Sequence, residues 1–171
     1  MLETIVIIVL IVLDQVVKYL VKTGIPLGTS VPLIPGVMGL TYLRNDGAAF
    51  SMLVGARWFF VVLTVAFLVF ALWVLYTKKL LHPFGKWAWV LVIAGAAGNL
   101  IDRALYGYVV DMFQTLFMNF AIFNVADIFV VVGGIAFCIY YAFLHDRLKA
   151  AQKPAADAEA EAQEEPDGNS L

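Results

Sequence analysis

The stretch that decides the fold is DMFQTLFMNFAIFNVAD, residues 111–127. It carries one carboxylate at each end, Asp111 and Asp127, separated by fifteen mostly apolar residues. In a single helix the two carboxyls would lie roughly 24 Å apart, because an α-helix rises about 1.5 Å per residue. A carboxylate in apolar surroundings must be paired, hydrogen-bonded or protonated. We therefore expect the chain to fold back between these acids and to bring them together.

The composition is that of a membrane protein. Of 171 residues, 63% are hydrophobic and 14% are charged, whereas soluble domains carry about 25% charged residues. The net charge of −2 hides an asymmetry, because six of the thirteen acids lie in the last fifteen residues. The single cysteine, Cys138, excludes a disulfide framework and a thiolate metal site. We expect no cofactor, no metal and no nucleic-acid partner.

The predicted fold is an all-α membrane protein with four transmembrane helices, a small extracytoplasmic β-cradle and a short interfacial helix. Four apolar segments are long enough to cross a bilayer, at about residues 2–21, 58–76, 87–105 and 125–144. Prolines and glycines interrupt residues 23–56, where strands are expected at 31–34 and 37–43 and a short helix near Gly47. Asp111 is expected on a loop.

The basic residues set the expected orientation. They gather between the second and third spans and after the fourth span, at Lys78, Lys79, Lys86, Arg147, Lys149 and Lys153. By the positive-inside rule, we expect these regions and both termini to be cytoplasmic. Three basic residues in or beside the first loop, Lys22, Arg44 and Arg57, weaken this prediction without reversing it. Residues 1–149 then form the folded domain, and residues 150–171 form a disordered acidic cytoplasmic tail.

Polar side chains converge on the outer ends of the spans or on the outer loops. They are Asn45, Asn99, Asp102, Arg103, Asp111, Asn124 and Asp127. Two carboxylates within a few ångströms do not both ionise cheaply, so one keeps a proton while the other acts as a base. Such a pair can activate a water for attack on a peptide carbonyl without a metal or a covalent intermediate.

Several alternatives remain for the supporting residues. Asp14 and Lys18, four residues apart on one helix face, either form an ion pair that tolerates burial or support the site. Asn45 either caps the short helix or holds a peptide backbone. Asp102 and Arg103 either satisfy each other or belong to the site.

Other functions fit the sequence less well. The two histidines, His82 and His145, form no HExxH motif and lie on the predicted cytoplasmic side. A serine/lysine dyad of Ser51 and Lys18 is conceivable. The main alternative from another class is a small proton-coupled transporter subunit or scaffold, in which intramembrane acids act as a relay.

Five short blocks resemble those of lipoprotein signal peptidase, also called signal peptidase II. They are DQVVK at 14–18, RNDGAAFSML at 44–53, GAAGNLIDR at 95–103, VVDMF at 109–113 and FNVAD at 123–127. The resemblance implies a bacterial inner-membrane aspartic endopeptidase, multi-pass and monomeric, that cuts prolipoproteins before a diacylglyceryl-modified cysteine. It also implies contact with membrane lipids and inhibition by globomycin-type cyclic peptides.

The resemblance assigns expected roles to individual residues. Asp111 and Asp127 correspond to the catalytic pair. The substrate-binding or supporting residues are Asn45, Gly47, Asn99, Asp102, Arg103, Asn124, Asp14 and Lys18. Two positions depart from the usual blocks, Asp46 in place of a threonine and Ile128 in place of a serine, and no role is assigned to either.

Overall fold

The computed structural model describes residues 1–47, 55–77 and 82–145. Four helices within these ranges are long and apolar enough to cross a membrane: α1 (Leu2–Gly24), α2 (Arg57–Tyr76), α3 (Pro83–Tyr106) and α4 (Val125–Ile139), which a π-helical turn (Tyr140–His145) extends. In α2 and α4 only 11% of the apolar window is buried. Many of their large apolar side chains are exposed, as they are in a protein surrounded by lipid, so the chain is a multi-pass membrane protein.

The predicted spans agree with the helices to within a few residues, and local signals set the limits of α3. Pro83 occupies the first turn, where its missing N–H is not needed, and the side chain of His82 accepts a bond from the Phe84 N–H at 3.2 Å. Gly107 ends the helix in the left-handed conformation, with φ 84°. This ending turns the chain directly into the strand that follows.

Helix α3 contacts each of the other three helices. Ala94 and Gly98, two small residues four positions apart, lie on the buried side of α3. A Cβ at Gly98 would lie 2.6 Å from Oδ2 of Asp14, so α1 and α3 meet closely there. The largest apolar cluster joins α1, α2 and α3 through Ile7, Ala71, Leu75, Val90, Ile93 and Ala94.

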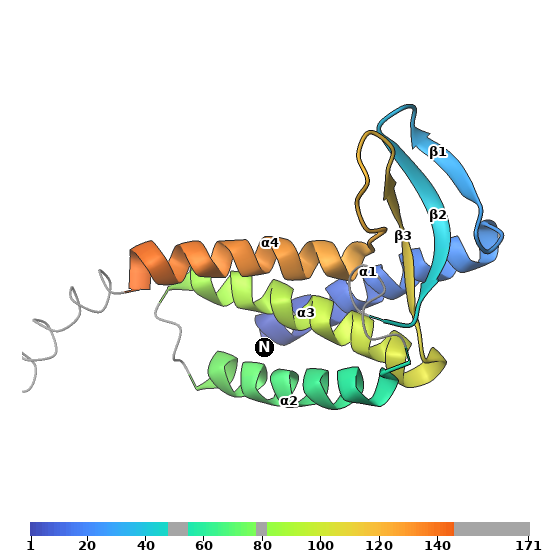
Figure 1. The fold of residues 1–171 in the computed structure, drawn as a ribbon. Coiled ribbons are helices and arrows are strands. Elements are labelled where there is room, and N and C mark those ends of the chain that lie inside the picture. The colour runs from blue at the N-terminus through green and yellow to red at the C-terminus, as the bar shows by residue number, and fades with distance from the viewer. Residues whose placement is uncertain (48–54, 78–81, 146–171) are drawn as a thin grey trace, which may run out of the picture.

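A three-stranded antiparallel sheet stands at one end of the helices, here called the sheet end (Figure 1). The strands β1 (Ser30–Ile34), β2 (Met38–Asn45) and β3 (Val109–Thr115) lie in the order β1-β2-β3. The two strands predicted between residues 23 and 56 are confirmed. The prediction that Asp111 lies on a loop is wrong, because Asp111 pairs with Leu43 inside the sheet.

The chain folds back after β3. The N–H groups of Met112 and Phe113 both donate to the Phe123 carbonyl, at 3.0 and 2.8 Å, and the Phe123 N–H returns a bond to Phe113 at 3.2 Å. This short pairing places Asn124, the first residue beyond it, beside β3.

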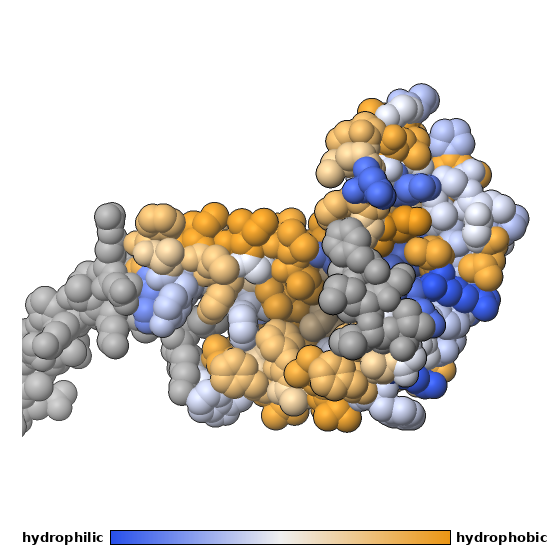
Figure 2. Space-filling view, viewed as in Figure 1, coloured by the Kyte–Doolittle hydropathy of each residue, from blue (hydrophilic) through white to orange (hydrophobic). Residues whose placement is uncertain are grey.

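Some expectations lie outside the part of the chain that the structure describes. They include the body of the short helix after Gly47, the basic residues 78 and 79, and the tail 150–171. Figure 2 shows apolar side chains along the helices, whereas most hydrophilic residues on this face lie toward the sheet end.

Candidate active site

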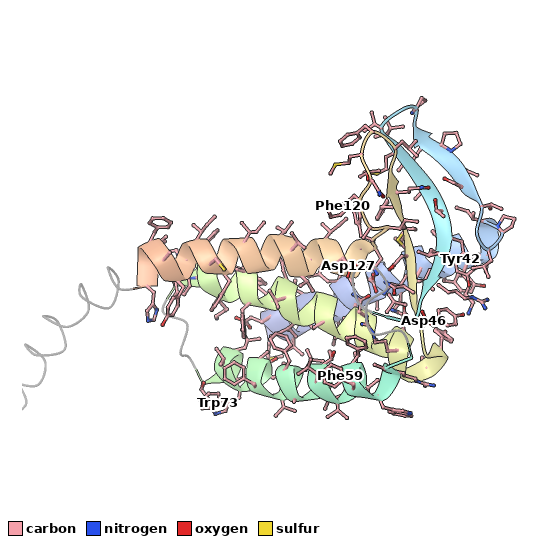
Figure 3. The ribbon with its side chains drawn as sticks, in the orientation of Figure 1. Tyr42, Asp46, Phe59, Trp73, Phe120 and Asp127 are labelled. Atoms are coloured by element: carbon pink, nitrogen blue, oxygen red, sulfur yellow. The ribbon has the colours of Figure 1, made fainter. Side chains whose placement is uncertain are left out.

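The two aspartates of residues 111–127 come from different elements. Asp111 belongs to β3 and is 2% exposed, and Asp127 belongs to the first turn of α4. Figure 3 labels Asp127 where α4 meets the base of the sheet. Residues 116–122 reverse the chain between the two acids, so the fold-back expected from the sequence is present.

Asn124 connects the two acids. Its Nδ2 donates to Oδ1 of Asp111 at 2.6 Å, and its backbone N–H donates to Oδ2 of Asp127 at 3.1 Å. In return, Asn124 Oδ1 accepts the Asp127 N–H at 2.9 Å. These reciprocal bonds form a capping box that begins α4. One fully buried residue therefore begins the helix, and it holds the Asp111 carboxylate through its side chain and the Asp127 carboxylate through its backbone N–H.

Two more asparagines complete the hydrogen bonds to the acids. Asn45 Nδ2, at the end of β2, donates to Oδ2 of Asp111 at 2.9 Å. Asn99 Nδ2, on α3, donates to Oδ1 of Asp127 at 2.8 Å. Each of the four carboxylate oxygens thus accepts one N–H bond, and the donors come from three different elements.

The acids line a cavity of about 440 Å³. Its walls combine polar residues at the acids with an apolar strip of α4 and of the segment before it: Asn45, Asn99, Arg103, Val109, Asp111, Phe120, Ala121, Ile122, Phe123, Asn124, Asp127, Ile128, Val130, Val131 and Val132. Figure 3 places Phe120 on the sheet side of Asp127. A concave, mostly apolar pocket with a few convergent polar groups is the usual form of a binding site.

Burial raises the pKa of the Asp111 carboxyl to about 6. The donors Asn45 and Asn124 oppose this rise because they stabilise the ionised form, whereas the nearby charge of Asp127 adds to it. A carboxyl that titrates near neutrality beside a second carboxyl suits acid–base chemistry.

Arg103 brings a positive charge to the cavity wall. Its Nη2 donates to the Gly47 carbonyl at 3.1 Å, and its guanidinium lies 5.1 Å from the centre of the Phe60 ring. The alternative that Arg103 and Asp102 satisfy each other is not what the structure shows, because Asp102 pairs with Lys18. Arg103 therefore holds the main chain after β2 against the cavity.

Four predicted site residues do not line the cavity: Gly47, Asp14, Lys18 and Asp102. The last three lie behind it as a buried cluster, in which Lys18 Nζ is 2.9 Å from Asp14 Oδ2 and 3.0 Å from Asp102 Oδ2. Lys18 Nζ also donates to Asn99 Oδ1 at 2.9 Å. This ammonium is enclosed by three acceptors, which argues against its use as the free base of a serine/lysine dyad; Ser51 lies outside the described residues.

Sequence reasoning missed two polar residues near the site. Gln15 Nε2 donates to Asp102 Oδ1 at 3.0 Å and to the Gly98 carbonyl at 3.1 Å. Arg57 donates to the carbonyls of Arg103 and Ala104, at 2.8 and 2.7 Å, and so satisfies the end of α3. Gln15 follows Asp14 directly, and a second polar residue inside an apolar span was the available signal.

Among residues 1–47, 55–77 and 82–145, no three histidine, cysteine or acidic side chains gather in a way that would hold a metal ion. The side-chain donors to the two aspartates are the amides of Asn45, Asn99 and Asn124.

Four apolar helices and an acid–amide cavity at one end define a class of protein, a multi-pass membrane protein with paired carboxylates. The profile of the family described as "Signal peptidase (SPase) II" matches residues 6–143. The chain belongs to the signal peptidase II family and is therefore an aspartic peptidase.

Relatives and solved structures agree with this assignment. The "Lipoprotein signal peptidase" of Lactococcus lactis subsp. cremoris (strain SK11) is 47% identical over 147 residues, which cover 86% of this chain and 96% of that protein. The protein of the same name from Streptococcus pyogenes serotype M1 is 46% identical over 132 residues, 77% of this chain and 87% of the relative. A solved "Bacterial membrane enzyme structure by the in meso method at 2.3 A resolution" is 35% identical, with a TM-score of 0.77 over 85% of this chain and 88% of that one.

Proposed function

We propose that this protein removes the signal peptide from diacylglyceryl-modified prolipoproteins, cutting before the lipid-bearing cysteine, with Asp111 and Asp127 as the catalytic pair. The observation that carries the proposal is the position of Asn124, which donates one hydrogen bond to each acid inside a single cavity. The name shared by the relatives, lipoprotein signal peptidase, supports the class of substrate.

The acid pair works by holding one proton between two carboxyls. Asp111, whose pKa burial raises to about 6, holds the shared proton on the acid side of that value, and Asp127 is the partner that accepts a proton during the reaction. The asparagine donors hold both carboxyls in place but bring no net charge that would compete for the proton. Asn45, Asn99 and Asn124 are thus positioning residues, and their amides also lie where a peptide backbone would bind.

Hydrolysis proceeds by attack of a water held between the acids. Asp127 takes a proton from the water while the water oxygen bonds to the scissile carbonyl carbon. At the same time, Asp111 donates its proton to the carbonyl oxygen. When the C–N bond of this intermediate breaks, the departing amine takes the proton that Asp127 holds, and the hydroxyl proton returns to Asp111. The products are a carboxylic acid and a free amine, and the pair again holds one proton.

The cavity wall favours entry of the substrate from the bilayer. Val131 and Val132 line the cavity, yet they are 56% and 50% exposed on the lipid-facing side of α4. A lipid-anchored peptide can therefore reach Asp127 along α4 while its acyl chains stay in the membrane. This route requires the sheet end to face the extracytoplasmic side, as the basic residues of the opposite end predict.

The relay alternative is less consistent with the positions of the acids. Among residues described here, Asp14, Asp102, Asp111 and Asp127 gather around the site, and Glu3 pairs with Lys86 at the other end of the bundle. A proton relay needs titratable groups spaced across the membrane. The clustering supports a local reaction rather than transport.

The direct test uses the purified full chain in lipid with two synthetic prolipoprotein peptides, identical except for the diacylglyceryl group on the cysteine. Mass spectrometry of the products should find a single cut, before the modified cysteine, and cleavage of the unmodified peptide should be at least about tenfold slower. Equal cleavage of the two peptides, a cut elsewhere or no cleavage of either one would overturn the proposal.

A further inference from the structure

Behind the cavity lies a buried charge cluster that stability alone does not explain. Asp14, Lys18 and Asp102 are 0%, 3% and 1% exposed, and they contain two carboxylates and one ammonium. Burying charges costs desolvation energy, and well-packed apolar residues in place of a buried ion pair often stabilise a protein as well or better. The contacts of the cluster point to a different purpose.

Each carboxylate of the cluster binds the main chain next to one of the paired aspartates. Asp102 Oδ2 accepts the N–H of Val110 at 3.1 Å, and Val110 precedes Asp111. Asp14 Oδ1 accepts the N–H of Ala126 at 2.9 Å, and Ala126 precedes Asp127. The two segments that carry the acids are therefore attached to one buried group of charges on α1 and α3.

Lys18 also sets the direction of an amide. Its ammonium has donors and no acceptor, so Asn99 must turn Oδ1 toward Lys18. Asn99 Nδ2 then faces Asp127 Oδ1, to which it donates at 2.8 Å. Without the ammonium, the amide could rotate and present its oxygen to the Asp127 carboxylate, which would repel it.

We propose that Lys18 is a positioning residue for the acid pair, because it orients the Asn99 amide as a donor to Asp127. Lys18 does not line the cavity, so it acts through its neighbours and not on the substrate. This inference rests on the proposed function, because it concerns the geometry of the same pair.

The test substitution keeps the charge of the cluster unchanged. Lys18→Met alone would leave two buried carboxylates without a counter-ion, so it is combined with Asp102→Asn. The cluster then has a net charge of −1 both before and after the change, and the amide oxygen that Asp102→Asn introduces can still accept the Val110 N–H. The matched control is Lys22→Met. Lys22 is an exposed cation one turn further along α1, and its Nζ lies 4.3 Å from the centre of the Tyr106 ring.

Turnover of the lipid-modified peptide is measured with the full chain for this double variant, for Asn99→Ala and for the two combined. We expect the double variant to lower kcat about 10- to 100-fold with KM changed less than about twofold, because small displacements of reacting groups cost rates of that order. In the Asn99→Ala background, the same substitution should lower kcat by less than about threefold, since the contact it acts through is already missing. Lys22→Met should leave kcat within about twofold of wild type.

Each result decides the inference. An equal loss of kcat in both backgrounds, or a wild-type kcat per folded molecule in the double variant, would overturn it. If the double variant does not fold, Asn99→Asp decides instead, because an ionised aspartate accepts from Lys18 but donates nothing to Asp127. Wild-type kcat in that variant would refute the inference. Failure of the wild-type protein to cleave would instead reject the proposed function, so the two failures are distinguishable.

Discussion

Replacing Asn45 by alanine tests whether the amide donors set the titration of the acid pair. Asn45 donates to Oδ2 of the buried Asp111, which stabilises the ionised carboxylate and so lowers the pKa of that carboxyl. A hydrogen bond to a charged group is worth about 1.5–3 kcal/mol, and one pKa unit corresponds to about 1.4 kcal/mol. Asn45→Ala should therefore raise the pKa of Asp111 from about 6 by about one to two units.

The assay is the pH dependence of kcat/KM for the lipid-modified peptide, which reports on the free enzyme. Because Asp111 must hold a proton, we expect kcat/KM of the wild type to fall as the pH rises through about 6. The falling limb of Asn45→Ala should lie about one to two pH units higher, whatever the absolute loss of rate. The control is Thr41→Val, which removes another polar contact between β2 and β3, the 2.8 Å bond to Gln114, without touching an acid. A falling limb that stays in place or moves to lower pH in Asn45→Ala would refute the reasoning.

Three further predictions concern stability and the tail. Gly98→Ala would place a Cβ 2.6 Å from Asp14 Oδ2, so the free energy of unfolding of this variant in mixed micelles should fall by about 1–3 kcal/mol. In the control Gly134→Ala, the new Cβ would meet no atom within 4 Å, and the free energy of unfolding should not change. Equal effects of the two substitutions would contradict the close packing at Gly98. Because the pKa of Asp111 is raised to about 6 in the folded state, protonation of this carboxyl contributes about 3 kcal/mol to the free energy of unfolding below about pH 4. This contribution is lost as the pH rises through about 6. Asp111→Asn should remove this pH dependence. If the free energy of unfolding of the variant differed between pH 4 and pH 8 as much as that of the wild type, this prediction would be wrong. Truncation after Lys149 should leave turnover within about twofold, because His145, the last described residue of this span, lies about 27 Å along the helix from Asp127. A tenfold loss would contradict this.

The helices could be predicted from the sequence because their signal is local. About twenty consecutive apolar residues have few other uses, so the four spans were placed within a few residues of their observed limits. The strand that carries Asp111 could not be predicted this way. Leu43, which pairs with Asp111, lies 68 positions earlier in the chain. Residues 109–115 also lack the clear alternation of apolar and polar residues that predicts a strand.

The candidate site shows the same division. The capping box of Asn124 and Asp127 is a local feature, because the two residues are three positions apart in the sequence. That Lys18 binds Asp102 as well as Asp14 depends on the packing of α1 against α3, and the spacing along α1 predicts only the pair within that helix. Gln15 was overlooked for the same reason, since its acceptors lie on α3 at Gly98 and Asp102.

The central claim is that Asp111 and Asp127 together hydrolyse the substrate. The most direct test measures turnover of the lipid-modified peptide by the purified full chain with Asp111→Asn, with Asp127→Asn and with the control Asp46→Asn, an exposed acid close to the site in sequence. We expect a loss of at least about 1,000-fold for each of the first two variants, because an acid–base group is removed, and a rate within about twofold of wild type for the control. Substantial turnover by either Asp111→Asn or Asp127→Asn, in protein that is shown to be folded, would contradict it.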